Sequence, residues 1–368
     1  MWLYAAAVLV GLYLLWRWHR ERQTVPRLSE KYVLITGCDS GFGNLLARQL
    51  DARGLRVLAA CLTETGAARL RAATSPRLQT VLLDVTSSQS IAAAAAWVRE
   101  CVGDRGGTGQ SPPSSSPSSP PPLCQPVPAQ PVPERGCGQG SSPGSPRPLS
   151  PGLWGLVNNA GTAIPTAPNE WLTKDDFVKV LDINLLGLIE VTLSVLPLVR
   201  QARGRVVNVA SVMGRLASFG GGYCISKFGV EAFSDTLRRE MRPFGVRVSI
   251  VEPGGFRTGM MDPATVVKGF RHIWDRLPAE TQAAYGHHYL ETYAKSTVLL
   301  HRLSSSRLSH VTSVIQHALL ARFPRSRYAA GWDARLVFLP LSYCPAWLTD
   351  ATISLFLPVP ARRTPESP

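Results

Sequence analysis

A short apolar run followed by a glycine-rich turn and a helix constrains the fold of this chain more than any other stretch. Tyr32–Thr36 is β-rich, Gly37–Gly43 has the spacing Gly-x-x-x-Gly-x-Gly, and Asn44–Leu50 is amphipathic with helical periodicity. Glycines let a backbone approach a pyrophosphate, and a helix N-terminus supplies N–H groups and a positive dipole end. The order strand, turn, helix therefore predicts a dinucleotide-binding unit. A glycine-rich turn without a ligand is the alternative, because the commonest dinucleotide folds use Gly-x-Gly-x-x-Gly instead.

Further β-rich segments follow, separated by segments with helical periodicity. The predicted strands are Leu55–Leu62, Gln79–Val85, Leu156–Gly161 (which ends in a tight turn), Gly204–Ser211 and Val246–Glu252. Strands that alternate with helices predict a parallel sheet covered on both faces. The chain has 368 residues, 45% of them hydrophobic, which is enough for one large domain. We predict the α/β class, with a doubly wound parallel sheet (Rossmann) in a single domain with membrane-associated ends.

The end of the second strand bears on the choice of nicotinamide cofactor. An acidic residue at this place bonds the ribose hydroxyls, and an Arg accommodates a 2′-phosphate. The chain has Cys61-Leu62-Thr63 there. The absence of Arg favours NAD and leaves NADP open, with Glu64 as a candidate ribose partner. Asp84, at the end of the third strand, is a candidate for the adenine amino group; a local turn or helix cap is the alternative.

A Tyr and a Lys four residues apart, Tyr223 and Lys227, stand at the start of a helix predicted over Lys227–Arg242. Residues at this spacing share a helix face. A nearby positive charge favours the phenolate and lowers the pKa of a Tyr, so the pair can supply a general acid/base. Ser211 ends a predicted strand and can bring a second hydroxyl to the same substrate oxygen. Asn184 interrupts a long apolar segment, either as a water-satisfied kink or as the holder of a proton relay.

Both ends of the chain are apolar. Trp2–Trp16 is followed by the basic residues Arg17, Arg20 and Arg22. This order is the reverse of a cleaved signal peptide, so residues 1–18 are predicted to be an uncleaved membrane anchor. The positive-inside rule then places the catalytic domain on the cytoplasmic face, with the endoplasmic reticulum as the expected membrane. The alternative is a helix packed on the protein's own core.

Residues 331–368 are predicted to form an apolar, membrane-associated segment and tail. Prolines within this segment argue against a spanning helix and favour a hairpin or short helix that lies on the membrane or packs on the domain. Between Gly259 and Leu300, aromatic residues recur at helical spacing. We expect them to shape a bulky apolar substrate site; ordinary core packing is the alternative.

The segments predicted to form the α/β domain fall into two parts, 30–106 and 153–330. Between them, residues 107–152 are almost all Pro, Ser, Gly and Gln, a composition that predicts disorder. A connection of this length is unusual inside such a fold. A lineage-specific surface loop and a retained intron in the gene sequence both explain it.

Charge and cysteine content narrow the class of partner. A net charge of +14 suits a phosphate-bearing cofactor, an anionic membrane surface, or both. No zinc-ligand spacing and no helix-turn-helix pattern occurs, so neither a metal nor a nucleic-acid partner is expected. The seven Cys have no regular spacing, which argues against a disulfide framework and for a reducing compartment.

Taken together, the motifs resemble those of the short-chain dehydrogenases/reductases. They occur in the family's order and approximate spacing: Thr36-Gly37-x-x-x-Gly41-x-Gly43, Asn158-Asn159-Ala160-Gly161, Asn184, Ser211, Tyr223-x-x-x-Lys227 and Pro253-Gly254. The segments around the glycine turn, around Tyr223 and at 327–345 are similar to the retinol dehydrogenase and 3α/17β-hydroxysteroid dehydrogenase branch. The segment 169–180 is similar to the orphan epidermal member of short-chain family 9C. The resemblance covers residues 1–360 except the insert.

The resemblance implies a role for each matching residue. Tyr223 would be the general acid/base, Lys227 would lower its pKa and hold the nicotinamide ribose, Ser211 would position the substrate oxygen, and Asn184 would anchor a water relay. The cofactor-binding positions would be Gly37, Asp39, Ser40, Gly41, Phe42, Gly43, Asp84, Val85, Asn158, Ala160, Gly161, Tyr223, Lys227, Pro253, Gly254 and Thr258. For Asn158 a structural role is the alternative, because its side chain can bridge strands by hydrogen bonds.

The expected function is oxidation of a lipophilic alcohol, retinol or a 3α-hydroxysteroid, with hydride transfer to NAD. A membrane anchor suits a substrate that partitions into lipid. An NADPH-dependent carbonyl reductase and a catalytically weak retinoid- or steroid-binding membrane protein are the alternatives. The resemblance also allows a homodimer.

Overall fold

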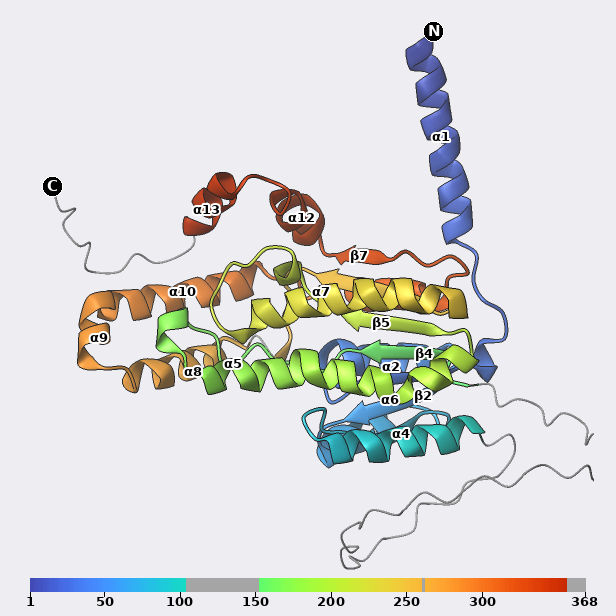
Figure 1. Ribbon diagram of the computed structural model, residues 1–368, viewed down its shortest axis with the longest axis horizontal. Helices are drawn as coiled ribbons and strands as arrows, with labels where there is room; N and C mark the ends of the chain where they lie inside the picture. The colour runs from blue at the N-terminus through green and yellow to red at the C-terminus, as the bar shows by residue number, and fades with distance from the viewer. Residues whose placement is uncertain (104–151, 260–261, 356–368) are drawn as a thin grey trace, which may run out of the picture.

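Seven parallel strands form one sheet at the centre of the molecule (Figure 1). The structure, a computed structural model, describes residues 1–103, 152–259 and 262–355. The strand order is β3-β2-β1-β4-β5-β6-β7. Strands β2 and β3 therefore lie on one side of β1, and β4 to β7 lie on its other side. The strands are β1 Tyr32–Thr36, β2 Arg56–Cys61, β3 Gln79–Leu82, β4 Gly155–Asn158, β5 Arg205–Val209, β6 Arg247–Pro253 and β7 Arg327–Ala330. The predicted doubly wound α/β class is confirmed.

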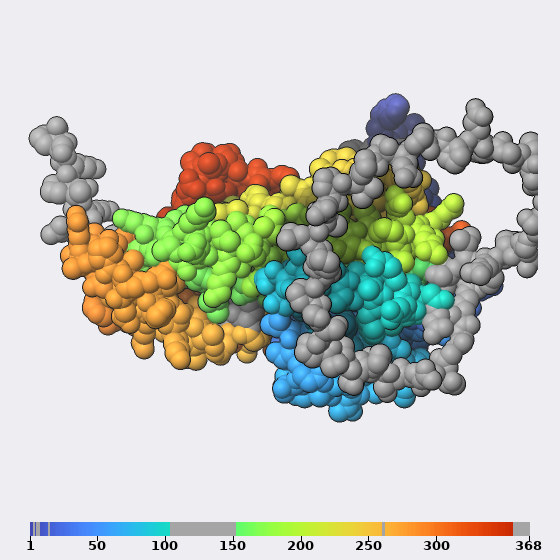
Figure 2. Space-filling model, turned by 60° about the horizontal axis from the view of Figure 1, so that its bottom comes forward, coloured from blue at the N-terminus to red at the C-terminus, as the bar shows by residue number. Residues whose placement is uncertain are grey.

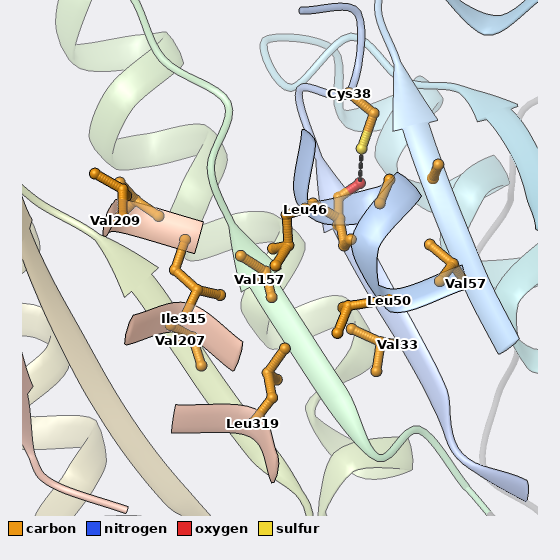
Figure 3. Packing of buried hydrophobic residues seen from close by; sticks show 14 of the residues in the cluster. Val33, Cys38, Leu46, Leu50, Val57, Val157, Val207, Val209, Ile315 and Leu319 are labelled. Atoms are coloured by element: carbon orange, nitrogen blue, oxygen red, sulfur yellow. Dashed lines mark hydrogen bonds between the residues drawn. The ribbon is translucent and has the colours of Figure 1, made fainter. Parts of the chain in front are cut away.

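Helices cover both faces of the sheet because the central strands are apolar on both sides. On one face lie α2 (Gly41–Ala52), α3 (Glu64–Ala72) and α11 (Ser309–Leu320), whose apolar side chains pack on β1, β2 and β4 to β6 (Figure 3). On the other face lie α4 (Ser88–Gly103), α6 (Gly187–Gln201) and α7 (Gly222–Met241). This arrangement leaves the carboxyl ends of the strands at one edge, where open α/β sheets bind ligands.

Several element boundaries differ from the sequence predictions. Helix α2 begins at Gly41, inside the glycine turn, and α7 begins at Gly222, so that Tyr223 and Lys227 are both helical. The predicted break near Asn184 is a π-helix, Asp182–Leu186, between α5 (Lys174–Leu181) and α6. β7 was not among the predicted strands.

Helices α8 (Pro263–Asp275), α9 (Ala279–Tyr285) and α10 (His287–Leu303) form a cap at one end of the molecule (orange in Figures 1 and 2). Trp171 lies at the centre of their aromatic cluster, with ring centroids 5.0 Å from both Phe270 and Trp274. All three side chains are buried. For these residues the contacts therefore show core packing, the alternative to a substrate site.

The N-terminal helix α1 (Trp2–Glu21) projects away from the sheet (Figure 1). Its base is fixed to the domain, since Arg325 Nε donates to Glu21 Oε1 at 2.8 Å and Val25 N–H donates to Leu320 O at 2.8 Å. Of the described residues, only the segment Lys174–Gln201 has the length and apolar composition of a membrane span. That segment holds α5 and α6, and α6 packs on the sheet as a core helix.

The described part of the C-terminal segment, up to Leu355, consists of short helical pieces, one of the two forms that its prolines favoured. They are a π-helix at Ala334–Phe338, α12 (Leu339–Leu341) and α13 (Ala346–Ser354). Their exposed side chains include Leu336, Tyr343 and Trp347. The predicted disordered insert, apart from Gly152, lies outside the described residues, as does the end of the tail.

Candidate active site

The glycine turn and the first turn of α2 form a cradle in which three positions, Gly37, Gly41 and Gly43, carry no side chain. Gly37 and Gly41 have φ angles of 71° and 61°, in the region that favours glycine. A Cβ on Gly43 would lie 2.3 Å from the carbonyl oxygen of Gly37. The side chain of the N-cap residue, Ser40, makes no capping hydrogen bond. The cradle therefore fits a pyrophosphate held by backbone N–H groups at a helix N-terminus.

The turn after β4 is locked to the glycine turn. Asn159 Nδ2 donates to the carbonyl oxygens of Thr36 and Gly37, both at 3.0 Å. Thr36 Oγ1 accepts the N–H groups of Asn159 and Ala160, also at 3.0 Å. Thr36 and Asn159 belong to the glycine-turn motif and the Asn-Asn-Ala-Gly motif, but neither residue was predicted to have a role of its own. Their residue types are suited to this task, since each can bond backbone groups of a neighbouring turn.

Asn158 points away from this turn and into the core. Its Nδ2 donates to Thr192 Oγ1 and to Asn208 Oδ1, both at 2.8 Å, and Asn208 Nδ2 donates to Ser234 Oγ at 2.8 Å. The network joins α6, β4, β5 and α7. The Asn158 side chain thus bridges strands and helices, so a cofactor contact at this position would have to come from its backbone.

Three side chains converge at the start of α7. The hydroxyl of Ser211, which follows β5, interacts with that of Tyr223 and acts to lower its pKa. Ser211 Oγ also accepts the Met213 N–H at 3.1 Å, and this fixes its direction. Lys227 Nζ donates to the Val209 carbonyl at 2.9 Å and lies 5.6 Å from the centre of the Tyr223 ring.

Burial governs the pKa values of this group. It raises the pKa of Tyr223, and the interaction with Ser211 lowers it in part. Burial also lowers the pKa of Lys227 to about 8, against the opposing effect of Glu231. The expected lowering of the Tyr223 pKa by Lys227 is not seen, because desolvation of the phenolate dominates. Lys227 instead points at a backbone carbonyl.

Asn184 is fully buried in the π-helix. Its Oδ1 accepts the Thr162 N–H at 2.7 Å, and its Nδ2 donates to Thr162 O at 2.8 Å and to Ser226 Oγ at 3.0 Å. The side chain thus fastens the loop after β4 to α7. A Cβ on Gly161 would lie 3.1 Å from Asn184 Oδ1 and 3.8 Å from Lys227 Nζ, so these residues share one small volume.

Asp39 reaches from the glycine turn to the end of β2. Its carboxylate accepts the N–H groups of Leu62 and Thr63 at 2.8 and 2.9 Å, and the Thr63 hydroxyl at 2.7 Å. Although burial acts to raise it, these bonds leave the pKa of Asp39 lowered. Glu64, the candidate ribose partner, pairs with Arg71 at 2.5 Å.

Asp84 and Val85 follow β3. Asp84 Oδ1 accepts the N–H and the hydroxyl of Thr86 at 2.9 and 2.7 Å, which lowers the pKa of Asp84. This is the local turn given as the alternative to adenine binding. The Asp84 side chain is also exposed, at the edge of the sheet where the strands have their carboxyl ends. Val85 is buried beside the apolar side chains of α4.

The loop after β6 folds back over the glycine turn. The Phe256 ring contacts that of Phe42 edge to face, with centroids 5.7 Å apart. The Thr258 methyl group lies 3.9 Å from the position of a Cβ on Gly41. Pro253 ends β6 and Gly254 begins this loop, so the loop runs from the carboxyl end of β6 to the cradle.

Comparison with known proteins agrees with this geometry. The sequence model of the short chain dehydrogenase family matches residues 31–104 and 149–266, leaving out 105–148. The chain is 54% identical to human retinol dehydrogenase 16 over 98% of its length and 99% of that protein. It is 50% identical to human 17-beta-hydroxysteroid dehydrogenase type 6 over 98% and 99%. For bovine short-chain dehydrogenase/reductase family 9C member 7, the identity is 48% over 96% and 99%.

Solved structures share the fold at low sequence identity. A short-chain dehydrogenase from Streptomyces avermitilis superposes with a TM-score of 0.58 at 24% identity, covering 88% of this chain and 95% of that one. Levodione reductase superposes with a TM-score of 0.54 at 20% identity, covering 84% and 100%. With its fold, its motifs and its relatives in agreement, the chain belongs to the short-chain dehydrogenase family, in the branch of the retinol and hydroxysteroid dehydrogenases, and is an NAD(P)-dependent oxidoreductase acting on an alcohol.

Proposed function

We propose that this protein oxidises a lipophilic alcohol, retinol or a 3α-hydroxysteroid, with NAD as hydride acceptor. The observation that carries the proposal is the convergence of three side chains at the start of α7: Ser211, whose Oγ accepts the Met213 N–H, Tyr223, and the buried Lys227, whose Nζ lies 5.6 Å from the centre of the Tyr223 ring. The names of the relatives support the substrate class. Tyr223 also lies in apolar surroundings: it packs with Met213 and Phe338, and its ring stacks on Phe219 at 5.8 Å.

The residues divide the chemical work as follows. The nicotinamide cofactor, when bound, supplies the hydride acceptor. The cradle at Gly37–Gly43 would hold its pyrophosphate and Lys227 its ribose. Ser211 would orient the substrate oxygen, and Tyr223 would take the hydroxyl proton as general base. If Asn184 anchors a water relay, the water would bind the backbone carbonyl oxygen of Asn184, because its side chain already bonds Thr162 and Ser226.

Asp39 supports NAD over NADP. It places a carboxylate at the end of β2, where the adenosine ribose binds in this kind of fold. A 2′-phosphate would meet that negative charge, while a ribose hydroxyl could donate to it. Arg71 on α3 could otherwise neutralise a 2′-phosphate, but its charge is already paired with that of Glu64.

We predict that Asp39→Ser changes the preference between cofactors. The ratio of kcat/KM with NAD to kcat/KM with NADP should fall about 10- to 100-fold, the usual effect of losing one charged contact. Steady-state kinetics with both cofactors measures the ratio. Asp51→Ser is the control, because Asp51 bonds Ser75 elsewhere on this face. An unchanged ratio in Asp39→Ser would count against NAD selection by this carboxylate.

We place the chain on the endoplasmic reticulum membrane, with its catalytic domain in the cytoplasm. The exposed apolar side chains of α1, together with Arg20 and Arg22 stacked on Trp16 and Trp18, support an anchor that ends at a membrane surface. Protease treatment of intact microsomes should remove an epitope placed after Pro368. Protection of that epitope would reverse the proposed orientation.

A homodimer is supported by apolar side chains exposed on the π-helix, α6 and α7. They are Leu186, Leu193, Ile225 and Phe228. Light scattering on the detergent-solubilised chain should give the mass of two copies. It should give one copy for a variant with Ile225→Glu and Phe228→Glu, and a monomeric wild type would overturn this proposal.

The function is tested with microsomes that contain this chain. All-trans-retinol and a 3α-hydroxysteroid are each assayed with NAD and with NADP, beside a Tyr223→Phe variant. Turnover with NAD that is lost in the variant supports the proposal. Turnover only of a carbonyl substrate with NADPH would favour a reductase, and binding without turnover in any combination would favour a carrier protein.

A further inference from the structure

One carboxylate of the C-terminal segment is fitted against the turn that follows β6. Asp333 Oδ2 accepts the Gly255 N–H at 2.6 Å, across a sequence separation of 78 residues. Next to this bond, the Gly254 N–H donates to Ala330 O at 2.9 Å. The turn is thus held by the end of β7 and by the residue three positions later.

The fit leaves no room for side chains at the neighbouring glycines. A Cβ on Gly254 would lie 2.2 Å from Asp333 Oδ2, and one on Gly331 would lie 2.4 Å from Oδ1. Real Cβ atoms do not approach other atoms so closely. The Asp333 carboxylate therefore occupies the space that glycine leaves open at both positions.

The turn held by Asp333 decides where the following residues lie. Phe256 is buried against Phe42 of the glycine turn, and Thr258 lies beside Gly41. If the turn shifted, both contacts with the cofactor cradle would shift with it.

The same segment also contacts the catalytic group. Ala334 is fully buried in a cluster with Met213 and Cys224, against which Tyr223 and Phe338 pack. Farther along, the Tyr343 hydroxyl accepts from Arg215 at 2.7 Å, close to Ser211 in sequence. The C-terminal segment thus forms a wall of the site, and Asp333 is its contact with the Pro253–Gly255 turn.

We infer that Asp333 is a positioning residue for cofactor binding, which holds the Pro253–Gly255 turn closed over the nicotinamide end of the site. The inference rests on the proposed function only in placing the nicotinamide beside this turn. It assigns the C-terminal segment a part in binding NAD that its own sequence does not suggest.

The test compares Asp333 variants in the full-length, detergent-solubilised protein. Energy transfer from tryptophan to NADH gives the Kd for NADH without any alcohol present. For Asp333→Ala we expect the Kd for NADH and the KM for NAD to rise about 10-fold, while kcat at saturating NAD stays within about 2-fold. Asp333→Asn should recover most of the affinity, because its Oδ1 can accept the same N–H.

Two further variants keep the test decisive. Asp333→Glu retains the charge, but its extra methylene cannot fit against Gly254, so it should also weaken NADH binding about 10-fold. Asp350→Ala is the matched control, since Asp350 is an exposed Asp of the same segment, and its Kd should equal that of the wild type.

Wild-type affinity in a folded Asp333→Ala or Asp333→Glu variant would overturn the inference. Loss of affinity that Asp333→Asn does not recover would also overturn it. A wild-type protein that binds NADH but oxidises no alcohol would contradict the proposed function alone, because the Kd series still reports on Asp333.

Discussion

At the scale of single residues, the proposed chemistry depends on where the proton of Tyr223 resides. Burial raises the pKa of this phenol, and Ser211 is the group that lowers it. Lys227 is itself desolvated, with a pKa of about 8. Alcohol oxidation needs the phenolate as base, whereas carbonyl reduction needs the phenol as acid. The two directions should therefore respond differently to pH.

We predict that kcat/KM for alcohol oxidation rises between about pH 6 and pH 8, because the phenolate fraction grows as the pH approaches the raised pKa of Tyr223. Over the same range, kcat/KM for reduction of the corresponding carbonyl compound should stay nearly constant, because Tyr223 remains almost fully protonated below its raised pKa. Initial rates in both directions across a buffer series measure this. Oxidation that is fastest at the acid end would contradict the assignment of Tyr223 as base.

At the scale of elements, α7 is joined to β6 and β7 by buried charges. Arg327 pairs with Glu231 of α7 and, at 3.1 Å, with Glu252 of β6. Burial raises the pKa of Glu231 to about 7, and the negative charge of Glu252 adds to the effect. Removing one member of such a group is costly, because it leaves another buried charge unpaired.

The raised pKa of Glu231 makes stability depend on pH. Its folded-state value, about 7, exceeds the ordinary 4.5, so its contribution is fully present below 4.5 and is lost as the pH rises through 7. The free energy of unfolding of Glu231→Gln, measured relative to that of wild type, should therefore increase by on the order of 1–3 kcal/mol as the pH rises from about 5 to about 8. Urea unfolding at several pH values measures the difference. Glu240→Gln, an exposed change on the same helix, should show no such trend, and a flat difference for Glu231→Gln would refute the assignment.

The sequence predicted the elements whose residues carry local signals. The glycine turn and β1 were identified because β-rich and Gly-rich segments adjoin there. Asn184 marked the break that proved to be a π-helix. The start of α7 was missed by five residues, since Gly221 and Gly222 read locally as a turn.

The contacts that the sequence could not predict join distant segments. Nothing near Asp39 indicates that its carboxylate reaches Thr63, and nothing near Asp333 indicates Gly255. The bridging role of Asn158 was one of two alternatives from the sequence, but its partners Thr192 and Asn208 are brought together only in the folded protein. The sequence could not show whether the aromatic residues of the cap line a substrate site or pack in a core. The answer depends on their contacts with Trp171, which lies far upstream in the chain.

At the scale of the whole molecule, α1 and the C-terminal helices project on the same side in the view of Figure 1. The C-terminal segment exposes Leu336 and Trp347, and its inner side chain Ala334 is buried beside the site. This arrangement suits a domain that lies on a membrane and takes its substrate from it.

We predict that the insert is dispensable. The match to the short chain dehydrogenase family leaves out residues 105–148, and α4 and β4 lie on either side of this stretch. Replacing these residues with a short Gly/Ser linker should leave kcat/KM within about 2-fold of the original, since surface insertions are tolerated at small entropic cost. Assays on both forms check this, and an inactive or insoluble deletion would show that the segment is needed for folding or activity.

The central claim is that hydride leaves the alcohol for NAD while Tyr223 accepts the proton. It is tested most directly with an alcohol that carries deuterium on its carbinol carbon, incubated with NAD and the full-length protein. Mass spectrometry of the cofactor should find one deuterium in the reduced nicotinamide, and Tyr223→Phe should bind NADH normally yet form labelled cofactor at least about 100-fold more slowly. Oxidised product with unlabelled cofactor, or an undiminished rate in Tyr223→Phe, would contradict the account.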